Sequence, residues 1–91
     1  LLIGEGASPV DTSKIKQALK DTDGVHHIIH SKTLYLGPDE LMLAAKIAVA
    51  PHSTANDIAR IIDTAEDNVR AAVPIARVIY LEPDILRDSK N

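Results

Sequence analysis

The chain has 91 residues and a net charge of −3, from 10 basic and 13 acidic side chains, so it is long enough for one small domain. Hydrophobic residues make up 45% of it but aromatic residues only 2%, so a core must be built from Ile, Leu, Val and Ala. The absence of cysteine excludes disulfides and thiolate metal sites, and the lack of a basic run or aromatic platform argues against nucleic-acid binding.

The first patterned segment predicts a helix over residues 9–21. Ser8 suits the N-cap position, Pro9 the first helical position and Asp11 the first turn. Turn-forming residues at 21–24 end the segment. The chain also begins in apolar sequence without an initiator Met, so we expect a piece of a longer protein; processing or an engineered start is the alternative.

Two strand-like runs, at 25–36 and 41–50, predict an antiparallel hairpin. Gly37-Pro38-Asp39-Glu40 lies between them and has the composition of a turn. The first run alternates imperfectly because histidines fall on both of its faces, which a β-bulge would explain. In the second run alternate residues form an apolar face that should meet the helices: Leu41, Leu43, Ala45, Ile47 and Val49.

A second helix and a third strand follow the hairpin. Ser53 and Thr54 offer hydroxyl caps, and the next apolar residues recur at spacings of three and four, which predicts a continuous buried stripe. We expect Pro74 to end this helix and Pro83 to end a strand at 75–82. The stripe comprises Ala55, Ile58, Ile62, Ala65, Val69 and Ala72.

The order α-β-β-α-β predicts an α+β fold of ferredoxin-like type. The second strand, second helix and third strand should form a right-handed crossover with the two strands parallel. Both helices should pack on one face of a three-stranded mixed sheet. The other face carries small residues and Lys46, so it is open either to solvent or to a partner.

The four histidines are the most evident chemical groups: His26, His27, His30 and His52. Neutral imidazole binds Zn²⁺ and similar ions, usually with carboxylates completing the site. In an extended strand His26 and His30 share one face and His27 lies on the other. In an antiparallel hairpin the start of the first strand lies beside the end of the second. His26 is at that start and His52 at that end, so we expect the two side chains to converge. Glu82, at the end of the third strand, is the expected nearby carboxylate. The alternative is that all these residues are polar surface groups in water.

No catalytic residue is predicted. His52 and Ser53 are adjacent residues in a capping position and lack the third group that orients a base toward a nucleophile. Gly4-Glu5-Gly6 is followed by Ala, Ser and Pro and precedes no strand, and therefore does not match a phosphate-binding loop.

Several of these segments together resemble a known family. Thr33, the run Leu36-Gly37-Pro38-Asp39-Glu40-Leu41, Pro74 after an amphipathic helix, and Ile79-Tyr80-Leu81-Glu82-Pro83 resemble the C-terminal cytoplasmic domain of cation diffusion facilitator transporters. The likeness runs from Ser8 to Asp84, and the opening Leu1-Leu2-Ile3-Gly4-Glu5 resembles the connection that leaves the last membrane helix in that family.

The resemblance implies a metallochaperone-like αββαβ domain at 9–84, a linker from an absent membrane domain at 1–8 and a flexible tail at 85–91. It implies a homodimer on the cytoplasmic face of the membrane, attached to a proton-coupled exporter of divalent cations such as Zn²⁺. Cytosolic metal would draw two protomers together and so bias the transporter.

The resemblance also implies a ligand set. The family's first-strand ligand falls on His26, its second-helix ligand near His52 or Ser53, and its late pair on Tyr80 and Glu82. Tyr80 removes one nitrogen ligand, and Lys46 lies where a further ligand is sometimes found. The expected zinc set is therefore His26, His52 and Glu82, assisted by His27 or His30.

Three hypotheses follow. The leading one is a non-enzymatic regulatory dimerisation domain that senses metal, and the second is a metal-independent structural dimerisation module of the same transporter type. The third is a freestanding small-ligand sensor of ferredoxin-like topology, which an upstream sequence with six apolar spans would exclude.

Overall fold

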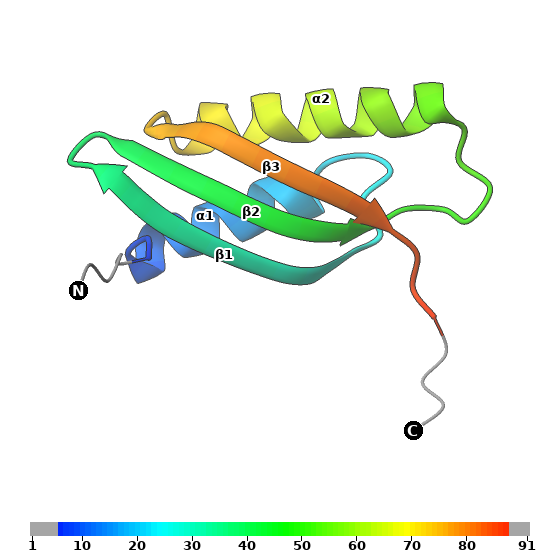
Figure 1. The fold of residues 1–91 in the computed structure, drawn as a ribbon, viewed down its shortest axis with the longest axis horizontal. Coiled ribbons are helices and arrows are strands. Elements are labelled where there is room, and N and C mark those ends of the chain that lie inside the picture. Colours follow the sequence, from blue (N-terminus) through cyan, green and yellow to red (C-terminus); the bar gives the residue numbers. More distant parts are fainter. Residues whose placement is uncertain (1–5, 88–91) are drawn as a thin grey trace.

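A computed structural model describes residues 6–87 of the chain (Figure 1). The expectations for a linker and a tail fall partly on residues 1–5 and 88–91, which lie outside the described residues. The order of elements is the expected one: α1 (Pro9–Lys20), β1 (His27–Gly37), β2 (Glu40–Ala48), α2 (Ala55–Ala72) and β3 (Ala76–Asp84). The strand order is β1-β2-β3, with β1 antiparallel and β3 parallel to β2, so the mixed sheet is confirmed.

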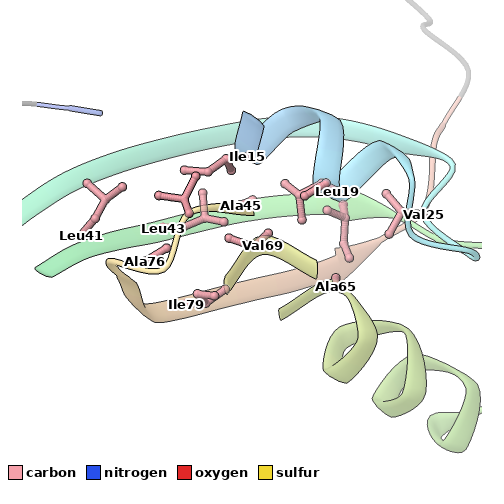
Figure 2. Close-up of a cluster of buried hydrophobic side chains, with 13 residues drawn as sticks. Ile15, Leu19, Val25, Leu41, Leu43, Ala45, Ala65, Val69, Ala76 and Ile79 are labelled. Atoms are coloured by element: carbon pink, nitrogen blue, oxygen red, sulfur yellow. The ribbon is translucent and has the colours of Figure 1, made fainter. Parts of the chain in front are cut away.

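The core lies between the two helices and one face of the sheet, as expected. Figure 2 shows Ile15 and Leu19 of α1 and Val69 of α2 gathered over the central strand β2. The predicted apolar face of β2 is buried, with Leu41, Leu43 and Ile47 fully inaccessible to solvent. The core is aliphatic, as the composition requires, because no aromatic ring is among its fully buried side chains.

Polar contacts fix the two helices at their ends. The Ser8 hydroxyl accepts a hydrogen bond from the backbone N–H of Asp11 and caps α1 as predicted. Thr22 follows α1 and is the one polar residue that is buried among residues 6–87. Its hydroxyl donates a hydrogen bond to the Ala18 carbonyl and accepts one from the Asn68 side-chain amide at 3.0 Å. The hydrogen bond from Asn68 therefore links the end of α1 to α2, and the buried Thr22 hydroxyl has a partner both as donor and as acceptor.

The expectation of a continuous buried stripe along α2 is wrong for the first turns of the helix. Ala65 and Val69 are buried, whereas Ile58 and Ile62 are half-buried and Ala55 is exposed. Figure 1 shows the reason: α2 begins beyond the end of β2, so its first turns have no sheet beneath them. A capping box at Thr54 supports that overhanging start.

The prediction that Pro83 ends the third strand is also wrong. β3 continues to Asp84, with Pro83 aligned to Ile47 and the Asp84 carbonyl accepting from the backbone N–H of Val49 at 2.8 Å. Proline is tolerated here because β3 is an edge strand and needs hydrogen bonds on one side only. This extension brings one more carboxylate onto the sheet.

The expected bulge in β1 is confirmed: it lies between Ile28 and His30 and interrupts the pairing of β1 with β2.

Among residues 6–87, no helix is both long enough and apolar enough to cross a membrane.

Candidate functional site: the open face of the sheet

The face of the sheet opposite the helices carries four rows of side chains, each contributed by all three strands. We call it the open face. The register defines the rows, from the hairpin end onward, as Leu34–Met42–Val78, Lys32–Ala44–Tyr80, His30–Lys46–Glu82 and His27–Ala48–Asp84. The first row is apolar, and the last two combine imidazole, ammonium and carboxylate groups. The open face therefore changes from apolar to charged along the strands.

The bulge in β1 decides which histidines share the open face. His27 aligns with Ala48 and His30 with Lys46, and both partners lie on the open face. Ile28 aligns with Ile47 and packs against the core instead. The expectation that His27 lies opposite His30 is thus wrong, because the bulge inserts one residue and shifts the two-residue alternation.

His26 and His52 lie at one end of the sheet, where β2 leaves it. The backbone N–H of His26 donates to the Ala48 carbonyl at 2.8 Å, and His52 lies in the turn that follows β2. Both side chains are exposed. Glu82 lies further back along the sheet, since it aligns with Lys46, two residues before Ala48.

The hollow beside the β1 histidines is basic. His26, His27 and His30 line a depression of 510 Å³ together with Lys16 and Lys20 of α1. Its lining includes no carboxylate. Two ammonium groups beside three imidazoles oppose the approach of a dication unless acidic ligands come from elsewhere.

Lys46 lies at the centre of the charged half of the open face. Its Nζ atom is 3.6 Å from Glu82 Oε2 and 3.9 Å from Asp84 Oδ2. Arg87 also pairs with Asp84 at 2.9 Å. The pKa of Asp84 is lowered, first by the backbone N–H of Ile85, then by Arg87, and least by the charge of Lys46.

The donor set around Lys46 does not fit a metal ion within one protomer. Among residues 6–87, no three His, Asp or Glu side chains are close enough to share an ion. His30 and Glu82 flank Lys46 from the two outer strands, and the Lys46 ammonium pairs with the Glu82 carboxylate. Asp84 is also paired with Lys46, and it was not predicted from the sequence. Tyr80 and Glu82 alternate along β3, and continuing that alternation past Pro83 would have placed Asp84 on the same face.

The sequence matches the family model described as "Cation efflux protein, cytoplasmic domain" over residues 7–84. The chain belongs to this family. The resemblance noted from the hairpin and the last strand is therefore confirmed, and the chain is a cytoplasmic domain of the cation efflux family. No curated protein sequence matches the chain.

Solved structures of the MamM CTD share the fold. The nickel form of one single-substitution variant superposes with a TM-score of 0.80 at 18% identity, over 88% of this chain and 100% of that one. The cadmium form of another gives 0.79 at 18% identity, over 87% and 98%. A doubly substituted variant gives 0.77 at 20% identity, over 86% and 93%. The metallochaperone-like αββαβ fold is thereby confirmed.

Proposed function

We propose that this cation efflux cytoplasmic domain dimerises through the open face and regulates a proton-coupled divalent cation exporter by sensing cytosolic zinc. In this proposal a covalently attached membrane domain performs transport, and the domain described here lies beneath it. The observation that carries the proposal is the open face itself: three strands present four aligned rows that neither helix covers.

A second copy of this chain is the occupant that the open face suits best. Tyr80 lies midway along the edge strand β3, next to the apolar row of Leu34, Met42 and Val78, and is 65% exposed. A twofold pairing sets the same patch against itself, so these apolar groups would meet across the axis. Burial of this row would also add to a small aliphatic core.

Metal sensing in this proposal uses an ion shared between two protomers. His26 and His52 supply imidazoles, Glu82 supplies a carboxylate, and His27 or His30 completes the set. Sharing is required because one protomer brings no three of these groups together in residues 6–87. An ion that binds only the closed pair stabilises that pair by mass action.

The test combines zinc titration calorimetry with sedimentation velocity, with nickel and cadmium as parallel ions. We expect heat on zinc addition and a more compact or heavier species. The double variant His26→Ala/His52→Ala should lose both. No heat and no change in mass or shape for the wild-type chain would end the metal-sensing part of the proposal.

A metal-independent dimerisation module is the second candidate, favoured by the pairing of the Lys46 ammonium with the carboxylate of Glu82, one of the expected ligands. In that case the His26→Ala/His52→Ala variant keeps the wild-type dimer and the wild-type melting temperature at saturating zinc. A zinc-dependent melting shift that the double variant lacks would rule this candidate out.

The interface itself is tested by one charged substitution and a matched control. Tyr80→Asp places a carboxylate on the open face and should convert the dimer to monomer by sedimentation equilibrium. Val10→Asp alters a side chain of similar exposure, 63%, on α1 and should leave the dimer intact. Equal behaviour of the two variants would place the interface elsewhere.

A further inference from the structure

The depression between α1 and the start of β1 gathers positive charge that no acidic side chain balances. We call this depression of 510 Å³, lined by Lys16, Lys20 and residues 25–31, the basic hollow. No carboxylate lines it, and neither lysine forms an ion pair within residues 6–87. The chain as a whole carries a net charge of −3, so the basic hollow runs against the overall charge.

The two lysines of the basic hollow repel each other. Lys16 and Lys20 are four residues apart on α1 and therefore lie on the same side of the helix, where like charges destabilise it slightly. Lys20 lies in the last turn of α1, where a cation also stabilises the helix dipole, but Lys16 lies one turn earlier. An anion bound beside both ammonium groups would remove the repulsion.

The opposite wall of the basic hollow supplies hydrogen-bond donors. β1 is an edge strand with β2 on one side only, so backbone N–H groups along its outer edge have no neighbouring strand to bond. Its three histidines and Ser31 add imidazole N–H and hydroxyl donors to the same lining. Val25 and Ile28 form an apolar part of the wall, and such low-dielectric surfaces concentrate the field of nearby charges. In Figure 1 the end of α1 and the start of β1 lie together at the end of the sheet away from the hairpin turn.

We propose that the basic hollow binds a phosphate-bearing polyanion, such as pyrophosphate or a compound that contains linked phosphate groups. Two ammonium groups and several N–H donors match the charge and the many acceptor oxygens of such an anion. The volume of the hollow lies within the range of about 300–1,000 Å³ that is usual for small-molecule sites. This inference goes beyond the proposed function, since it requires neither a metal ion nor a second copy of the chain.

Titration calorimetry with pyrophosphate tests the inference, on metal-stripped protein in a chloride buffer of low ionic strength. We expect saturable heat for the wild type. Lys16→Gln/Lys20→Gln should weaken binding about tenfold or more, because two charges close to the ligand are lost. Lys16→Arg/Lys20→Arg keeps both charges and should retain binding. No saturable heat for the wild type, or unchanged affinity in the glutamine variant, overturns the inference.

Lys14→Gln/Arg77→Gln is the matched control, because it removes two positive charges from outside the basic hollow. Lys14 lies on α1 but lines a groove between the two helices, and Arg77 lies in β3, where its guanidinium donates to the Asp39 carbonyl. The control should keep wild-type affinity. A loss as large as that of Lys16→Gln/Lys20→Gln would reduce the effect to net charge and overturn the inference. All four substituted side chains are exposed, so both variants should fold, which circular dichroism checks.

Amide chemical shifts in NMR spectra locate the ligand. Pyrophosphate should shift the N–H signals of residues 25–31 and of the last turns of α1. Shifts of similar size around Lys14 and Arg77 would show general charge attraction and overturn the inference. Ser31→Asp places a carboxylate in the lining of the basic hollow and should abolish the shifts, which keeps the test available if the lysine variants do not fold.

A vesicle experiment separates the two sources of phosphate. Co-sedimentation with phosphatidylcholine vesicles that contain a phosphoinositide, lost in Lys16→Gln/Lys20→Gln, supports the inference with a lipid headgroup as the ligand. Pyrophosphate binding without co-sedimentation supports it with a free anion as the ligand.

His52→Ala separates the inference from the proposed function. His52 belongs to the proposed zinc set but does not line the basic hollow, so its substitution should weaken zinc binding and leave pyrophosphate affinity unchanged. An equal loss of pyrophosphate affinity would place the anion outside the basic hollow and overturn the inference. A wild type that binds pyrophosphate but neither binds zinc nor dimerises contradicts the proposed function alone, and a dimer that gives no heat with pyrophosphate contradicts the inference alone.

Discussion

Substitution of Gly24 tests how the turn after α1 is joined to α2. Gly24 has a φ of 97°, in the region that side chains with a Cβ avoid, and an added Cβ would lie 2.6 Å from both Cγ1 and Cδ1 of Ile61. The backbone conformation costs a non-glycine residue roughly 1–2 kcal/mol. Displacing Ile61 from its rotamer adds about 0.5–1.5 kcal/mol.

The unfolded chain offsets part of that cost, because alanine restricts it more than glycine, by about 0.4–1 kcal/mol. Gly24→Ala should therefore destabilise the fold by about 2 kcal/mol. For a domain of this size that corresponds to a fall in melting temperature of roughly 8–16 °C. Urea denaturation followed by circular dichroism, at one fixed protomer concentration and in chelator, measures the free energy of unfolding.

Gly37→Ala is the control for this experiment. Gly37 does not have a positive φ, and a Cβ there would meet no atom within 4 Å. Its substitution should change stability by less than about 0.5 kcal/mol. A Gly24→Ala variant as stable as wild type, or a Gly37→Ala variant equally destabilised, would refute the assignment of strain to Gly24.

Four further substitutions probe the core and the caps. Leu19→Ala removes a fully buried side chain and should cost about 3 kcal/mol in urea denaturation; a cost below about 1 kcal/mol would mean that the helix does not pack as described. Thr22→Val leaves the Asn68 amide without its acceptor and should cost about 1 kcal/mol, which an Asn68→Ala background should largely remove. Thr54→Ala breaks the capping box of α2 and should cost about 1 kcal/mol at neutral pH. The pKa of Asp57 is lowered, first by the backbone N–H of Thr54, so its stabilising effect is complete above its unfolded pKa of about 3.9 and is lost as pH falls through the folded value. Denaturation midpoints of the wild type and of Asp57→Asn should therefore converge as the pH is lowered below about 4, and a constant gap would contradict this cause.

Local chemistry in the sequence was sufficient for most of the fold. Ser8 and Thr54 cap helices because their hydroxyls can bond the first free N–H groups, and this requires no distant contact. The alternation of Leu41 to Ile47 likewise specified the buried face of β2, because side chains in a strand alternate whatever it pairs with. Tertiary context was needed to see that α2 overhangs the sheet and that Pro83 sits on an edge.

The candidate site depended on strand register, which the sequence alone does not specify. The sequence by itself determined the element order, the hairpin, the caps and the apolar faces, along with a histidine-rich segment at the start of β1. The tertiary structure decided that a bulge sets His27 and His30 on one face and that Asp84 joins Glu82 there. It also placed Lys46 on the strand between β1 and β3, with its ammonium beside the carboxylates of Glu82 and Asp84. The physical reason is that these groups come from three strands, and a shift of one residue in any pairing would move its side chains to the opposite face.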